Sequence, residues 1–272
     1  MKSRLLRKEY LIIASNSTSL FVISYLILWL VLKVITAIAA LAFGIHSVIN
    51  YDKIDFLIRG SDWTGDAVKI VFSAGPVAAF IISLFLLILY GNIVQESGRL
   101  KLLIVWALTQ SWVMVFGDML MGAIFNRGLG YVLLYLFVMD TGKMVITLIG
   151  LVVLFFFGLS MSRFYLYTAN SYYSTLNHSN RAPFIIFQYI VPFVAGNIII
   201  ILLKLPGISV YEIFVNLTMA IFLIPLVIRS IASQDLWFDE EPRTIRISWR
   251  YAGSAVTLLI LYRVLLSVGI RF

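Results

Sequence analysis

The sequence predicts an all-α fold: a polytopic membrane protein whose 272 residues form a single transmembrane domain (residues 1–272) with seven membrane-spanning helices. Hydrophobic residues make up 61% of the chain and charged residues only 12%, about half the charged share of a soluble domain. Seven apolar runs are long enough to cross a bilayer as helices. Lysine and arginine are also divided unequally between the alternating loops.

The first apolar run, residues 20–43, would form a helix of roughly 36 Å, which is enough to cross the hydrocarbon layer. Residues 1–19 begin with several basic side chains and are predicted to be a cytoplasmic and interfacial segment. Lys33 lies near the middle of the helix. An ammonium group at that depth costs about 2.5–3.5 kcal/mol, so Lys33 requires a partner, a water-filled cavity or a path to the interface.

The other predicted spans cover residues 69–90, 102–125, 144–160, 184–203, 211–228 and 251–270. Residues 130–139 form a further apolar run that is too short to cross a bilayer. We interpret this run as a re-entrant or interfacial segment, or as an extension of the fourth helix. Three spans contain a proline that is expected to bend them, namely Pro76, Pro192 and Pro225.

Positive charges predict the orientation. With a cytoplasmic N-terminus, seven basic residues lie in outside loops: Lys53, Arg59, Lys69, Arg127, Lys143, Lys204 and Arg271. Of the 21 lysines and arginines, twelve then lie inside and two lie within spans. This excess predicts a cytoplasmic N-terminus and an outside C-terminus, and we expect the cell inner (plasma) membrane as the location.

Positive loops that face an anionic leaflet also explain the net charge of +8. The basic residues are spread over many loops and form no stripe that would bind nucleic acid. The expected partners are therefore the lipid bilayer and other membrane proteins.

Asp118 is the only acidic residue deep within a predicted span. We therefore predict a buried ion pair between Lys33 and Asp118 that joins the first and third helices. The pair would either stabilise the bundle alone or relay a proton or an ion. Arg263, in the last span, is expected to extend to the outer interface, or to pair with Asp140 or Glu212.

Small residues predict where helices pack, because they let two backbones approach closely. The predicted packing face consists of Thr36, Ala40, Gly44, Gly75, Pro76 and Gly122. A separate aromatic and acidic cluster in an inside loop is predicted to be a solvated or docking surface. It consists of Trp237, Phe238, Asp239, Glu240 and Glu241.

The chain offers little for catalysis. It has no cysteine and two histidines, His46 and His178, in predicted loops on opposite sides of the membrane. This composition excludes disulfides, iron–sulfur clusters and cysteine–histidine zinc sites. We therefore expect no enzyme activity, no catalytic residues, no bound metal and no cofactor.

Three segments carry a family resemblance. Residues 32–36 read Leu-Lys-Val-Ile-Thr and are followed by small residues, Gly75 and Pro76 open the second span, and Asp118 precedes Gly122 by four residues. Together, over residues 20–125, they resemble the site-2 protease family of intramembrane metalloproteases. The first segment looks like that family's HExxH helix with its metal ligands replaced. The resemblance implies a pseudoenzyme in which the charge of Lys33 replaces the metal opposite Asp118.

These features leave two functional classes. The first is a non-catalytic membrane subunit that scaffolds or binds other membrane proteins, in line with a protease-like pseudoenzyme. The second is a transporter or channel for a small solute, ion or lipid that uses Lys33 and Asp118. A polar cavity that reaches both residues would favour the second class, whereas a packed interior with a large apolar flank would favour the first.

Overall fold

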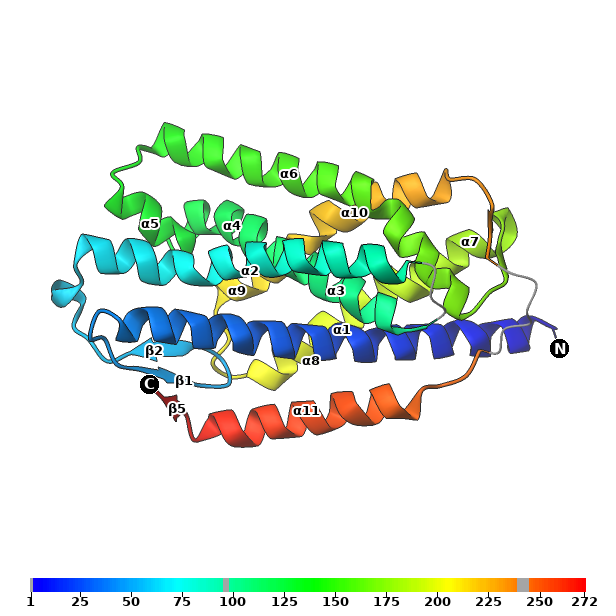
Figure 1. Ribbon diagram of the computed structural model, residues 1–272, viewed down its shortest axis with the longest axis horizontal. Helices are drawn as coiled ribbons and strands as arrows, with labels where there is room; N and C mark the ends of the chain where they lie inside the picture. The colour runs from blue at the N-terminus through cyan, green and yellow to red at the C-terminus, as the bar shows by residue number, and fades with distance from the viewer. Residues whose placement is uncertain (1, 95–97, 239–244) are drawn as a thin grey trace.

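The computed structural model describes residues 2–94, 98–238 and 245–272. Helices account for most of these residues, and the long helices lie along the longest axis of the molecule (Figure 1). Six helical segments are long and apolar enough to cross a membrane: Lys8–Leu41, Gly65–Ile93, Leu100–Phe125, Asp140–Ser171, His178–Lys204 and Val210–Ile231. The fold is all-α, as predicted, and these segments indicate a multi-pass membrane protein.

The central element is α1 (Lys2–Leu41), which packs against α2, α3, α8 and α11. It is one continuous helix, because no proline or glycine interrupts it. The segment before residue 20, predicted to be interfacial, belongs to this helix, and within it Ile13 and Ser17 are fully buried. The Ser17 hydroxyl donates to the Gln188 carbonyl (2.6 Å) and accepts from the Trp106 indole (3.0 Å), so this part of α1 belongs to the core.

Two long helical segments pack against α1. The first is α2 (Gly65–Ile93), whose start is capped by the Thr64 side chain. The second consists of α3 (Leu100–Trp112), the π-helical turn η2 (Val113–Gly117) and α4 (Asp118–Phe125). The π-helical turn ends directly before the predicted site residue Asp118, and such turns are frequent at functional sites.

The apolar run at residues 130–139 does not form a span. It lies in α5 (Leu129–Tyr135), which is too short to cross a bilayer, and in the turn that leads to α6 (Asp140–Tyr167). The backbones of α4 and α5 approach so closely that a Cβ atom on Gly122 would lie 2.9 Å from the Gly130 nitrogen. Gly122, a predicted packing residue, thus permits the α4–α5 contact.

The remaining helical elements are η1 (Gly60–Asp62), η3 (Thr168–Ser171), α7 (His178–Ile185), η4 (Ile186–Ile190), α8 (Val191–Lys204), α9 (Val210–Leu217), α10 (Met219–Ile231) and α11 (Trp249–Ser267). The elements α7, η4 and α8 form one rod, and α9 and α10 form the next. The last helix, α11, lies against α1 and runs in the same direction (Figure 1). It corresponds to the predicted seventh span but is absent from the six segments that satisfy length and hydropathy.

A small sheet closes one end of the bundle. Its strands are β1 (Ser47–Ile49), β2 (Ile54–Phe56) and β5 (Ile270–Arg271), in the antiparallel order β2–β1–β5. At the opposite end, β3 (Thr175–Leu176) pairs with β4 (Leu236–Trp237). The end of the chain that follows α11 is thus fixed beside the hairpin that follows α1 (Figure 1).

Arg263 forms no ion pair with Asp140 or Glu212 within the described residues. Its guanidinium donates to the carbonyls of Leu203 (2.7 Å) and Leu205 (3.1 Å), and it stacks on the Tyr51 ring at 3.9 Å. These carbonyls lie at the C-terminal end of α8, where intrahelical partners are lacking. Arg263 therefore caps α8 and attaches α11 to it.

Tight packing between α6 and α10 generates a stability prediction. A Cβ atom at Gly158 would overlap the Phe222 carbonyl and lie 3.0 Å from Cγ of Pro225. We expect Gly158→Leu to destabilise the purified protein by about 1–3 kcal/mol, measured as a lower midpoint of thermal unfolding in detergent. The control Gly253→Leu adds the same side chain where no atom lies within 4 Å. Equal midpoints for both variants would contradict the predicted packing.

Candidate functional site

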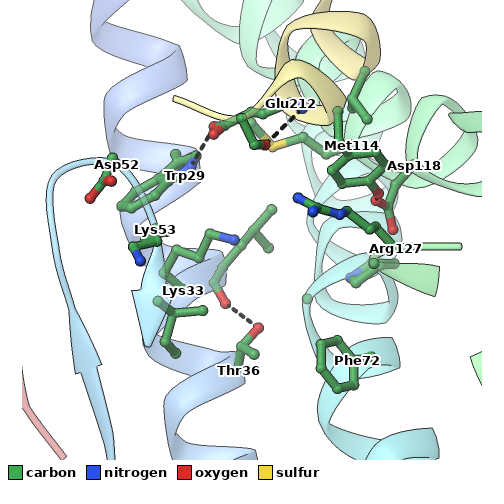
Figure 2. A pocket seen from close by; sticks show the side chains of 18 of the residues that line it. Trp29, Lys33, Thr36, Asp52, Lys53, Phe72, Met114, Asp118, Arg127 and Glu212 are labelled. Carbon is green, nitrogen blue, oxygen red and sulfur yellow. Dashed lines mark hydrogen bonds between the residues drawn. The ribbon is translucent and has the colours of Figure 1, made fainter. Parts of the chain in front are cut away.

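A cavity of about 440 Å³ lies between α1, α2, α4 and α9, at the end of the molecule that carries the β1–β2 hairpin (Figure 2). Both predicted intramembrane charges, Lys33 and Asp118, line it. Lys53 and Arg127 also line it, and both are exposed, so the cavity reaches the surface at this end. Lys33 lies eight residues before the end of α1, which places it roughly 12 Å along the helix from that end.

Lys33 and Asp118 face the same cavity but do not form the predicted ion pair, since no contact within 4.0 Å joins their charged atoms. The Asp118 carboxylate accepts hydrogen bonds from the Tyr211 hydroxyl and from the Leu129 N–H (3.1 Å). The ammonium of Lys33 lies 5.4 Å from the centre of the Trp29 ring, within the range of a cation–π interaction. Each charge thus has a different local partner.

A buried ion pair joins Lys204 and Glu212. The Lys204 side chain is fully buried, and its ammonium also donates to the Tyr25 hydroxyl (3.1 Å). Glu212 accepts from the Tyr25 hydroxyl (3.1 Å) and from the Trp29 indole (3.2 Å). These contacts connect α1, the end of α8 and the start of α9 in one polar cluster, which we name the Lys204–Glu212 cluster.

The sequence did not predict this cluster, although it contains a motif that indicates the position of Glu212. Because Lys204 ends an apolar run, the sequence predicts that it lies in an outside loop, but it is the last residue of α8. Glu212 follows Ser209 by three residues, the spacing of a capping box. The Ser209 side chain does accept from the Glu212 N–H (3.2 Å), so the motif places Glu212 in the first turn of α9.

Arg127 and Lys53 have different surroundings at the mouth of the cavity. Lys53 forms an ion pair with Asp55 (2.8 Å), and the hydrogen bond to that carboxylate raises the pKa of Lys53. Arg127 follows Asn126, which ends α4 in a left-handed conformation with φ of 51°. The chain reverses at this point, and Figure 2 shows the Arg127 side chain reaching into the cavity.

The predicted packing face is divided between several contacts. Gly75 of α2 faces Thr36 of α1, since a Cβ atom on Gly75 would lie 3.1 Å from the Thr36 hydroxyl oxygen. Thr36, Gly75 and Pro76 also line the cavity. Ala40 is fully buried, whereas Gly44 lies beyond the end of α1 in a turn with φ of +71°. Gly44 is therefore not part of a helical face.

The predicted docking loop is partly described. The side chain of Trp237 is 81% exposed, and the Phe238 N–H donates to the Ser174 carbonyl (2.9 Å). Asp239, Glu240 and Glu241 lie outside the described residues. The loop begins next to an ion pair between Arg181 and Asp235 (2.5 Å), in which Arg181 is 3% exposed.

In the described part of the chain, no group of three histidine, cysteine, aspartate or glutamate residues could hold a metal ion. Comparison of the chain with protein-family models, with curated proteins and with solved structures gave no match. The resemblance to the site-2 protease family therefore stays a prediction. What the geometry offers is a charged and aromatic cavity suited to binding.

The Lys204–Glu212 cluster generates the second prediction. Glu212→Gln would leave the buried ammonium of Lys204 without its carboxylate, which typically costs about 3–5 kcal/mol. We expect a clear fall in the midpoint of thermal unfolding. The double variant Lys204→Met, Glu212→Leu removes both charges and should lose less.

The matched control is Asp140→Asn. It breaks the pair between Lys143 and Asp140 (3.5 Å), whose carboxylate side chain is 98% exposed. An exposed pair contributes about 0–1 kcal/mol, so this variant should unfold close to the parent protein. If Glu212→Gln unfolds no earlier than Asp140→Asn, the cluster does not stabilise the fold.

Proposed function

We propose that this protein binds a small solute within the membrane, as a transporter or a solute receptor does. The observation that carries the proposal is the cavity that contains both Lys33 and Asp118. Its volume, about 440 Å³, falls in the range of small-molecule sites. Ionisable groups inside a membrane usually face a water-filled cavity and mark a pathway for a solute or an ion.

The proposal treats the cavity as a binding site and includes no chemical step. The side chains that line it are charged, polar, aromatic and aliphatic, and neither histidine is among them. His46 lies beside the Phe272 carbonyl (3.2 Å), and His178 begins α7 at the other end of the molecule. Neither histidine is therefore placed to act as a general base on a bound solute.

We further propose that α11 is a seventh span and that the N-terminus lies in the cytoplasm of a cell with an inner membrane. Twelve inside and seven outside basic residues support this orientation. The contact of α11 with α1 along the bundle supports the additional span. In this orientation the cavity opens on the outside.

A second candidate function is the non-catalytic scaffold or partner-binding subunit. Two side chains favour it: Trp237 is 81% exposed and Trp249 is 77% exposed, both at the end opposite the cavity. Exposed tryptophans suit a partner interface as well as the headgroup region of a bilayer. As a pseudoenzyme, the protein would bind a segment of its partner in the cavity instead of a solute.

Labelling of single cysteines tests the accessibility of the cavity, and the chain has no native cysteine to interfere. Thr36 lines the cavity, while the adjacent Ala37 is fully buried. We expect Thr36→Cys to react with a membrane-impermeant thiol reagent in intact cells, and Ala37→Cys to stay unreacted. Protection of both positions would remove the support for an accessible solute site and would favour the scaffold.

The same method tests the topology. Ser61 lies between β2 and α2, Val268 follows α11 and is 87% exposed, and Gln234 precedes β4 at the opposite end. If α11 crosses the membrane, single cysteines at Ser61 and Val268 should react from the outside, and one at Gln234 only after the membrane is opened. If the cysteine at Val268, like the one at Gln234, reacts only after the membrane is opened, the seventh span is excluded.

A further inference from the structure

Two cationic side chains reach into the cavity from different walls. Lys33 comes from α1 and Arg127 from the turn between α4 and α5, and Figure 2 shows both directed into the space between these elements. Neither forms an ion pair with a carboxylate in the described residues. Two positive charges that face one cavity repel each other, and an anion bound between them would offset this repulsion.

The carboxylates that line the cavity contact other groups, and Lys33 acts electrostatically on Asp118 and Glu212 without an ion-pair contact to either. Glu212 is bound to Lys204, and Asp118 accepts from the Tyr211 hydroxyl and the Leu129 N–H. Asp52 is 8% exposed and acts electrostatically on Lys204. The third cation of the lining, Lys53, has its own partner in Asp55. Lys33 and Arg127 are thus left to face the interior of the cavity.

Much of the rest of the wall is apolar and includes several aromatic rings. Phe72 of α2 stacks in a tilted arrangement with Tyr131 of α5, with ring centres 4.9 Å apart, and Phe56 of β2 packs edge-on against Phe72 at 5.8 Å. The ring of Trp29 lies beneath the Lys33 ammonium. Such a surface favours an apolar body, and the cations at one side of it favour a charged group attached to that body.

We propose, on the basis of the function proposed above, that the solute is a small amphiphilic oxyanion. Its carboxylate or phosphate group binds between Lys33 and Arg127, and its apolar part lies against Trp29, Phe72 and Tyr131. Guanidinium groups bind oxyanions with two parallel hydrogen bonds, and lysine adds a point charge. The same chemistry is offered by a free organic acid or phosphate and by the headgroup of an anionic lipid.

The first experiment compares the rates at which Thr36→Cys reacts with an anionic and a cationic methanethiosulfonate reagent of similar size. Rates are normalised to those of Ser61→Cys in the exposed loop. Electrostatic focusing in a charged cleft changes local concentrations by tenfold or more, so we expect a preference on the order of tenfold for the anionic reagent. Adding Arg127→Gln or Lys33→Gln should reduce this preference.

Lys143→Gln is the matched control, because Lys143 lies near the same end but binds Asn126 (2.9 Å) and does not line the cavity. It should leave the preference unchanged. The Arg127 side chain is exposed and forms no hydrogen bond or ion pair within the described residues, so Arg127→Gln should keep the unfolding midpoint of the parent. A faster cationic reagent, or a preference that survives both cavity variants, would overturn the oxyanion inference while leaving an accessible cavity intact.

The second experiment identifies the source of the oxyanion by thermal unfolding in detergent. The probes are octyl phosphate, octanoate, octanol, octylamine and dihexanoyl phosphatidic acid. A higher midpoint with octyl phosphate or octanoate, lost in Arg127→Gln, supports a free amphiphilic acid. A rise only with the phosphatidic acid supports a lipid headgroup. If octanol and octylamine raise the midpoint as much as octyl phosphate and octanoate do, and Arg127→Gln leaves these shifts unchanged, oxyanion recognition is refuted. If Thr36→Cys does not react at all, the proposed function itself fails.

Discussion

The buried ion pair between Lys204 and Glu212 is the interaction on which the cavity depends. It fixes the first turn of α9 against α1 through Tyr25 and Trp29, and it holds the end of α8 at the same place. Tyr211, the residue before Glu212, then reaches the carboxylate of Asp118 on α4. Two walls of the cavity are thus joined by consecutive residues of α9. A shift of α9 would displace both the Glu212 contacts and the contact between Tyr211 and Asp118.

The structure separates charges that serve the fold from charges that face the cavity. A buried ion pair stabilises little compared with an apolar replacement, but it is geometrically demanding, because a misplaced partner leaves a charge in a medium of low dielectric. The Lys204–Glu212 cluster therefore selects one arrangement of α1, α8 and α9. Lys33, one turn beyond Trp29, acts electrostatically on Glu212 but forms no ion pair with it, and it lines the cavity.

The apolar runs predicted the helical class well, because the length of such a run limits what it can form. They also predicted that Lys33 and Asp118 share one environment. Their direct pairing did not follow, since a sequence gives the depth of a residue in a span but not its direction around the bundle. The predicted helix boundaries differ from those of the structure where polar residues are buried. Ser17 and Lys204 mark the ends of apolar runs in the sequence, yet both belong to long helical segments.

The energetic position of Lys33 distinguishes the two functional classes. A scaffold gains little from an ammonium that forms no ion pair, and methionine would fill the same space. The cation–π contact with Trp29 contributes only about 0.5–2 kcal/mol. Arg127 adds a second positive charge to the same cavity. Retention of both charges is physically reasonable if an anion enters between them, and this argument favours solute binding over a purely structural role.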